Sequence, residues 1–162
     1  MFQHEAIKFD FETGAGNFVP RDGENLATTT IEISTEQAAS GTNSIKMDAA
    51  ASGNWSAWIN YTDTFTLQAG GVPVMYEYKI YKVSGTAINF LAPWINRGGN
   101  TTVQQFWHNT IQSAPFDEWT TIRTQLATPS NTANDYNMYF RHSGSGTIYL
   151  DDVRIIEADE RP

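Results

Sequence analysis

The stretch Val74-Met75-Tyr76-Glu77-Tyr78-Lys79-Ile80-Tyr81 decides the fold class. Its even-numbered residues are all apolar or aromatic, whereas its odd-numbered residues include Glu77 and Lys79. A period of two is typical of a β-strand that buries one face and exposes the other. Aromatic and β-branched side chains also favour the pleated surface of a sheet. The stretch therefore predicts a half-buried strand.

The same alternation recurs along the rest of the chain, at 31–33, 45–47, 120–126 and 148–155. Clusters of Gly, Asn, Ser and Pro separate these runs, at 13–17, 97–100, 128–131 and 143–146. About ten short strands without a long amphipathic helix are the pattern of an all-β sandwich. We therefore expect an all-β fold, a β-sandwich with jelly-roll topology made of two antiparallel sheets, one of them concave.

The length of 162 residues is that of one domain. No internal repeat, linker or domain break interrupts the sequence. We expect residues 1–157 to form a single module. The charged residues 158–162 are expected to be a tail or the start of a linker to something longer.

Charge and composition exclude several function classes. The net charge of −8 argues against nucleic acid and anionic membranes as partners. The absence of cysteine removes thiolate nucleophiles and Cys-ligated zinc. The three histidines are scattered, no Gly-x-Ser-x-Gly elbow is present, and the acidic residues concentrate towards the two termini. We therefore expect a protein that is not an enzyme.

Carboxylates at the two ends of the chain form a candidate metal site. Asp10 and Glu12 share one face of the first strand, and Asp151 and Asp152 lie in the last strand. The first and last strands of a jelly roll commonly lie side by side, which would bring the four carboxylates together. Ca²⁺ accepts carboxylate and carbonyl oxygens at such a site and would relieve the repulsion. Separate solvated charges explain the spacing equally well.

Several aromatic residues lie beside amide and guanidinium side chains. If Met138 and Phe140 face the core, Tyr139 and Arg141 project the other way. By the same alternation, Phe106 is a core residue and leaves Gln105 and Trp107 outward; Gln125 is likewise outward. Flat rings flanked by polar groups suit a sugar, whose C–H face stacks on the ring while its hydroxyls find hydrogen-bonding partners. Core packing is the alternative for each ring taken alone.

The chain resembles carbohydrate-binding modules of families 4, 9 and 22, the β-jelly-roll modules attached to xylanases and β-glucanases. The most specific segment is Tyr149-Leu150-Asp151-Asp152-Val153. Weaker segments occur in the right order over nearly the whole chain: Phe11-Glu12-Thr13-Gly14, Ser40 to Met47, Gly70-Gly71 and Trp119 to Ile122.

The resemblance implies a non-catalytic module with a structural Ca²⁺ and a cleft across the concave sheet. The implied calcium ligands are Asp10, Glu12 and Asp151, with backbone carbonyls near Thr42 and Asn43. In the cleft, Trp55 matches the stacking tryptophan of family 22, Arg21 its cleft arginine, and Trp107 and Tyr139 its other aromatic positions. The chain departs from the pattern in three ways: Phe18 replaces a tryptophan, Trp58 and Trp94 are extra aromatics, and the segment Arg141-His142-Ser143 lacks the acidic cleft residue.

We therefore expect a calcium-stabilised module that binds internal stretches of a neutral β-linked plant polysaccharide, xylan or β-glucan. It would target a parent secreted glycoside hydrolase, in the same chain, to that polymer. The expected sugar-binding residues are Arg21, Trp55, Trp58, Gln105, Trp107, Gln125, Tyr139 and Arg141. A structural or adhesion domain that contacts a neighbouring protein is the alternative, and a small jelly-roll enzyme that degrades polysaccharide is a third.

Overall fold

The computed structural model describes residues 2–16, 18–20, 29–49, 57–61, 63–67, 74–97, 101–105, 112–126 and 133–159. Their strands are β1 (Phe2–Phe9), β2 (Phe18–Pro20), β3 (Thr29–Ser34), β4 (Ser44–Ala49), β5 (Ala57–Tyr61), β6 (Phe65–Leu67), β7 (Val74–Lys82), β8 (Ala87–Arg97), β9 (Thr101–Gln105), β10 (Trp119–Leu126) and β11 (Ala133–Asp159). In this part of the chain, every pairing between named strands is antiparallel. No helix among these residues is long and apolar enough to span a membrane.

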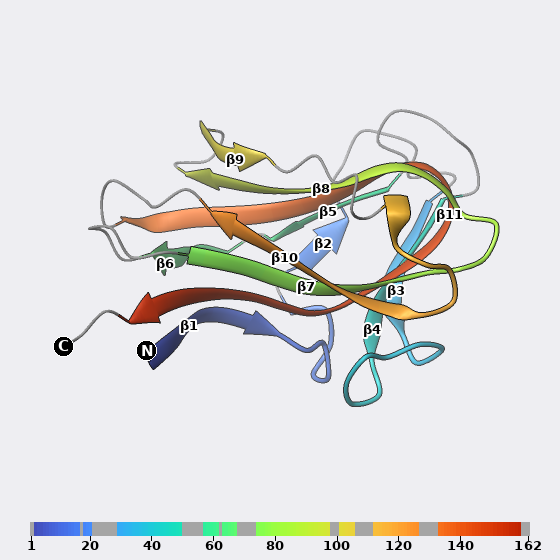
Figure 1. Ribbon diagram of the computed structural model, residues 1–162, viewed down its shortest axis with the longest axis horizontal. Coiled ribbons are helices and arrows are strands. Elements are labelled where there is room, and N and C mark those ends of the chain that lie inside the picture. The colour runs from blue at the N-terminus through green and yellow to red at the C-terminus, as the bar shows by residue number, and fades with distance from the viewer. Residues whose placement is uncertain are drawn as a thin grey trace.

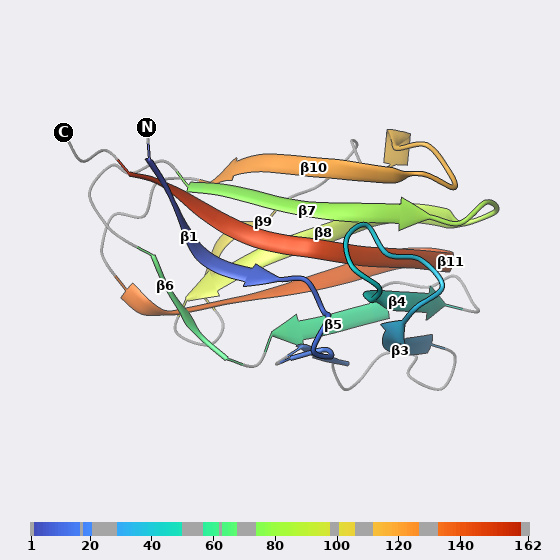
Figure 2. The same ribbon diagram turned by 90° about the horizontal axis from the view of Figure 1, so that it is seen from below.

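The 27-residue strand β11 runs through both layers of the molecule (Figure 1). Its first half pairs with β5, β6 and β8, and β2 and β9 extend this group, which we call layer B. Its second half pairs with β1, β4 and β7, and β3 and β10 extend that group, which we call layer A. In Figure 2, β10, β7, the second half of β11 and β1 lie side by side.

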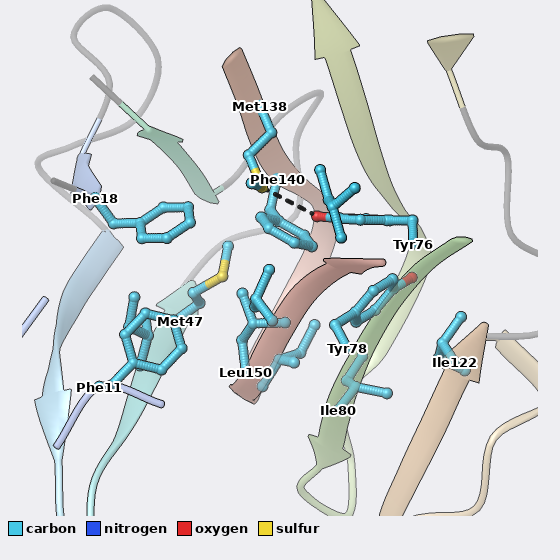
Figure 3. Close-up of a cluster of buried hydrophobic side chains, with 14 of the residues drawn as sticks. Phe11, Phe18, Met47, Tyr76, Tyr78, Ile80, Ile122, Met138, Phe140 and Leu150 are labelled. Atoms are coloured by element: carbon cyan, nitrogen blue, oxygen red, sulfur yellow. Dashed lines mark hydrogen bonds between the residues drawn. The ribbon is translucent and has the colours of Figure 1, made fainter. Parts of the chain in front are cut away.

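The hydrophobic core lies between the two layers. Met138 and Phe140 of layer B are fully buried against Tyr76 and Tyr78 of layer A (Figure 3). The ring centroids of Phe140 and Tyr78 are 5.4 Å apart, and the Tyr76 hydroxyl donates to the sulfur of Met138 at 3.5 Å. Large aromatic rings bury the most apolar area per residue, so this cluster stabilises the packing of the layers.

The prediction of an all-β fold is confirmed. The even-numbered residues of β7 are buried from Val74 to Lys82, as the alternation predicts. The Gly-Ser cluster 143–146 does not separate two strands, however; it lies inside β11, where the strand passes from one layer to the other. Gly144 and Gly146 have φ of 129° and 117° there, which L side chains rarely adopt. The last strand also continues to Asp159, two residues beyond the expected end of the module.

Candidate functional site

The face of layer B that points away from the core carries the candidate site. Met138 and Phe140 belong to the core cluster, so Asn137 and Tyr139, which alternate with them, lie on the opposite face. Tyr139 is outside the core cluster although its side chain is only 5% exposed.

Strand register aligns four positions with polar or aromatic residues across layer B. Tyr139 of β11 lies directly opposite Asn60 of β5 on one side and Trp94 of β8 on the other. Trp94 in turn lies opposite Gln105 of β9. Residues directly opposite in antiparallel strands share a face. By register, the positions of Asn60, Tyr139, Trp94 and Gln105 are aligned across four strands, and we call this alignment of positions the amide–aromatic row.

Two further positions flank the row. Arg141 lies two residues along β11 from Tyr139 and directly opposite Trp58. Asn137 lies two residues in the other direction and opposite Asn96. The side-chain oxygen of Asn137 is buried and accepts no hydrogen bond from any described residue. A buried acceptor without a donor is unfavourable, so this oxygen is a cost to the stability of the described structure.

A second cluster fastens the loop 39–43 to the turn that follows β1. Because β1 ends at Phe9, Asp10 and Glu12 lie in this turn, and the prediction that they share a face of the first strand is wrong. The Glu12 carboxylate accepts the backbone N–H of Asn43 at 2.8 Å, the N–H of Thr42 at 3.0 Å and the Thr42 hydroxyl at 3.0 Å. The N–H groups of Asn43 and Thr42 hold the pKa of the Glu12 carboxyl below its ordinary value. Asp10 accepts the N–H of Glu12 at 3.2 Å and so fixes the turn after β1.

Asp151 holds the other end of the same loop from the last strand. Its carboxylate is fully buried and accepts the N–H groups of Ala39 at 2.8 Å, Ser40 at 3.1 Å and Asp152 at 2.7 Å. Burial raises the pKa of Asp151, because the charged form is desolvated and these three N–H groups offset only part of the cost. Asp152, next in the chain, pairs with Lys79 at 2.6 Å instead.

Several solved structures with a similar fold are modules of xylanases. The CBM22-1 xylan-binding domain of Paenibacillus barcinonensis Xyn10C matches with a TM-score of 0.62 and 17% identity, over 98% of this chain and 97% of that one. The C-terminal family 22 module of Clostridium thermocellum Xyn10B matches with a TM-score of 0.60 and 14% identity, over 98% and 96%. The chain has the fold of a family 22 carbohydrate-binding module. The sequence matches no protein-family model and no curated protein.

Within this family 22 fold, the predicted sugar-binding residues have different outcomes. The register places the positions of Trp58, Gln105, Tyr139 and Arg141 on one face of layer B. Gln125 is exposed as expected, but it lies on β10 in layer A, so its assignment to the same face is wrong. Alternation predicts whether a residue points outward and does not predict which layer its strand joins. Three predicted residues, Arg21, Trp55 and Trp107, lie outside the described residues.

Tyr139 lies on the predicted face without being the exposed ring that we expected. Its 5% exposure means that surrounding groups cover most of the ring. A position in a central strand has neighbours on both sides, and alternation within one strand does not reveal them. The residue that sequence reasoning missed is Trp94, which the register places directly between Tyr139 and Gln105. No signal in the sequence itself assigns Trp94 to this row, because β8 has apolar residues on both faces.

Four of the predicted metal ligands lie in the loop 39–43 or accept its N–H groups: Thr42, Asn43, Glu12 and Asp151. Asp10 contacts the N–H of Glu12, and the first and last strands pair from Phe2 to Phe9. Their oxygens are the type of ligand that Ca²⁺ prefers. Within the described residues, however, no three His, Asp or Glu side chains converge on one point. A calcium ion fits this loop only if one or two carboxylates act together with backbone carbonyls.

Proposed function

We propose that the chain is a non-catalytic carbohydrate-binding module that binds an internal stretch of a neutral β-linked polysaccharide, xylan or β-glucan. The polymer would lie on the outer face of layer B. In a larger secreted glycoside hydrolase, this binding would raise the local concentration of the enzyme at its substrate. The amide–aromatic row carries the proposal, and the likeness in fold to xylan-binding modules supports it.

The chemistry of the row suits a sugar. Each amide side chain both donates and accepts hydrogen bonds, as a sugar hydroxyl does, and a tryptophan offers a flat apolar surface for the C–H face of a pyranose. Four adjacent strands span three spacings of about 4.8 Å, or about 14 Å, so the row has room for more than one sugar ring. Hydroxyls exchange water for protein hydrogen bonds at little net gain, so we expect dissociation constants of roughly µM to mM.

Native affinity electrophoresis tests the proposal. The protein is run in gels containing xylan, mixed-linkage β-glucan, glucomannan, galactan or pectin, with calcium present. We expect retardation by xylan or β-glucan, and at least tenfold weaker retention for Trp94→Ala. Trp119→Ala is the matched control, because Trp119 lies on β10 in layer A. There its ring packs against that of Tyr81, with 5.6 Å between the ring centroids. Thermal melts of both variants show whether either substitution unfolds the protein.

Three results would contradict the proposal. If no polymer retards the protein, a structural or adhesion domain that contacts a neighbouring protein becomes the better hypothesis. If a polymer retards the Trp94→Ala variant as strongly as the wild type, the binding face lies elsewhere. If the protein releases reducing ends or unsaturated products from any of these polymers, it is an enzyme.

We also propose that Ca²⁺ binds beside the loop 39–43. Asp151 supports this proposal, because its fully buried carboxylate has no cationic partner among the described residues. By contrast, the neighbouring carboxylates of Glu77 and Asp152 each form an ion pair with a basic side chain. Residues Glu12 and Asp151 would supply side-chain oxygens, Asp10 lies at the same turn, and Thr42 and Asn43 would supply carbonyls.

A further inference from the structure

Two adjoining cavities lie on the outer face of layer A, on the opposite side of the core from the amide–aromatic row. The first, of about 280 Å³, is lined by Lys8, Ser40, Glu77, Lys79, Asp152 and Arg154. The second, of about 250 Å³, is lined by Met75, Glu77, Arg123, Arg154 and Ile156. Glu77 and Arg154 form the wall that they share. Apart from Ser40 of the loop 39–43, the lining residues lie on β1, β11, β7 and β10, which lie side by side in Figure 2.

Positive charge is concentrated around these cavities. Four basic residues line them against two acidic ones, whereas the whole chain has 10 basic and 18 acidic residues. The lining therefore carries a net charge of about +2 on a protein of net charge −8. A concave surface of opposite sign to the rest of the molecule attracts anions.

Glu77 holds the two guanidinium groups in place. Glu77 is only 4% exposed and lies directly opposite Arg123 on one side and Arg154 on the other. It accepts the Nε–H of Arg154 at 2.6 Å and the Nε–H of Arg123. A guanidinium has five N–H donors, so each arginine keeps donors that Glu77 does not use. Both side chains remain accessible, with exposed fractions of 63% for Arg123 and 36% for Arg154.

Other cationic groups of the first cavity are also available. Lys8 is exposed and makes no hydrogen bond or ion pair with any described residue. Lys79 has one ion pair, to Asp152. The Nη1 atom of Arg154 lies 3.9 Å from the Glu5 carboxylate, which is too long for a hydrogen bond.

We propose that the first cavity binds a uronic acid residue, a sugar ring that carries one carboxylate. An arginine with free donors matches a planar carboxylate in a two-pronged geometry. Glu77 and Asp152 are acceptors, which suit the ring hydroxyls and would repel a ligand made only of anionic oxygens, such as phosphate. A volume of about 280 Å³ lies just below the range for drug-sized ligands and suits a single ring. The site does not rest on the function proposed for layer B.

NMR titration of ¹⁵N-labelled protein with D-glucuronate tests the proposal, with D-glucose, inorganic phosphate and hexaglutamate as competing probes. With glucuronate we expect saturable chemical-shift changes of the amide signals of Lys8, Lys79 and Arg154. Glucose, phosphate and hexaglutamate should each bind at least tenfold more weakly. Lys8→Ala removes an exposed cation that makes no hydrogen bond or ion pair with any described residue, and it should weaken glucuronate binding at least tenfold with an unchanged melting temperature. Lys46→Ala is the control, because Lys46 pairs with Glu36 at 2.8 Å and lines neither cavity.

Each other outcome overturns the proposal. Equal binding of glucuronate and phosphate would reveal a simple anion site, and equal binding of glucose would show that the carboxylate is not recognised. Tighter binding of hexaglutamate would indicate a contact surface for an acidic protein segment. Equal weakening by Lys8→Ala and Lys46→Ala would show that only the overall charge matters. Absence of saturable shifts with glucuronate would remove the site.

Discussion

Gly146→Ala tests how tightly β11 is held where it passes between the layers. Gly146 pairs with Ala49 of β4, and its φ is 117°. A Cβ added there would lie 2.6 Å from the Cα and from Oγ1 of Thr86. The Cα belongs to the backbone, so the clash cannot be relieved by rotating a side chain. Moving Thr86 would also disturb the hydrogen bonds of its hydroxyl with the N–H and the carbonyl of Thr147, both 3.0 Å.

The expected cost has two parts. Holding alanine at such a φ costs about 1–3 kcal/mol, and overpacking costs about 1–3 kcal/mol more. The total is about 4 kcal/mol at the centre of these ranges. For a domain of this length, 1 kcal/mol corresponds to about 2–4 °C, so the melting temperature should fall by roughly 8–16 °C.

Gly14→Ala is the matched control, because Gly14 has a similar φ of 109° and no atom within 4 Å of the added Cβ. It retains the backbone cost alone, about 2 kcal/mol or roughly 4–8 °C. The entropy that alanine removes from the unfolded chain affects both variants alike and cancels in the comparison. Thermal and urea unfolding measure both variants. Equal losses of stability would show that Thr86 does not crowd Gly146, and the described crossing of β11 would then be wrong.

Three further predictions concern acid stability, the core and calcium. The N–H groups of Asn43 and Thr42 lower the pKa of the Glu12 carboxyl below its ordinary value of 4.5. The charged carboxylate therefore stabilises the fold fully above pH 4.5, and this stabilisation is lost as the pH falls through the lowered pKa of Glu12. Glu12→Gln should therefore flatten the acid side of a plot of melting temperature against pH, and an unchanged slope would count against these bonds. Phe140→Ala should lower the free energy of unfolding by about 3–5 kcal/mol in urea, since the ring is fully buried. Calcium at 100 times its dissociation constant should raise the free energy of unfolding by about 2.7 kcal/mol. A melting temperature that neither calcium nor a chelator changes would exclude the site.

The sequence predicted the strands well because alternation is a local property. The runs at 74–81 and 120–126 fall inside β7 and β10. It failed at 143–146, because glycine and serine clusters mark both turns and sharp passages within a strand. Only the packing against Thr86 and the pairing with β4 distinguish the two.

The candidate site was predicted less completely, because it depends on pairing between distant strands. Alternation predicted that Tyr139 lies on the opposite face of the strand from Met138 and Phe140, and the core cluster confirms this. It could not place Trp94 beside Tyr139, nor assign Gln125 to layer A, because both facts follow from register. The contacts of Glu12 with the loop 39–43 likewise join residues about 30 positions apart.

A contribution to stability does not by itself explain why Arg123, Glu77 and Arg154 lie side by side on layer A. Burying the Glu77 carboxylate costs desolvation free energy, which offsets much of its attraction to the two accessible arginines. Apolar neighbours are already at hand, because Met75 and Ile156 line the same cavity. Backbone pairing aligns the three strands without the charges. What the network adds is two guanidinium groups held in fixed positions with donors left towards solvent, and that arrangement is useful for recognising a carboxylate.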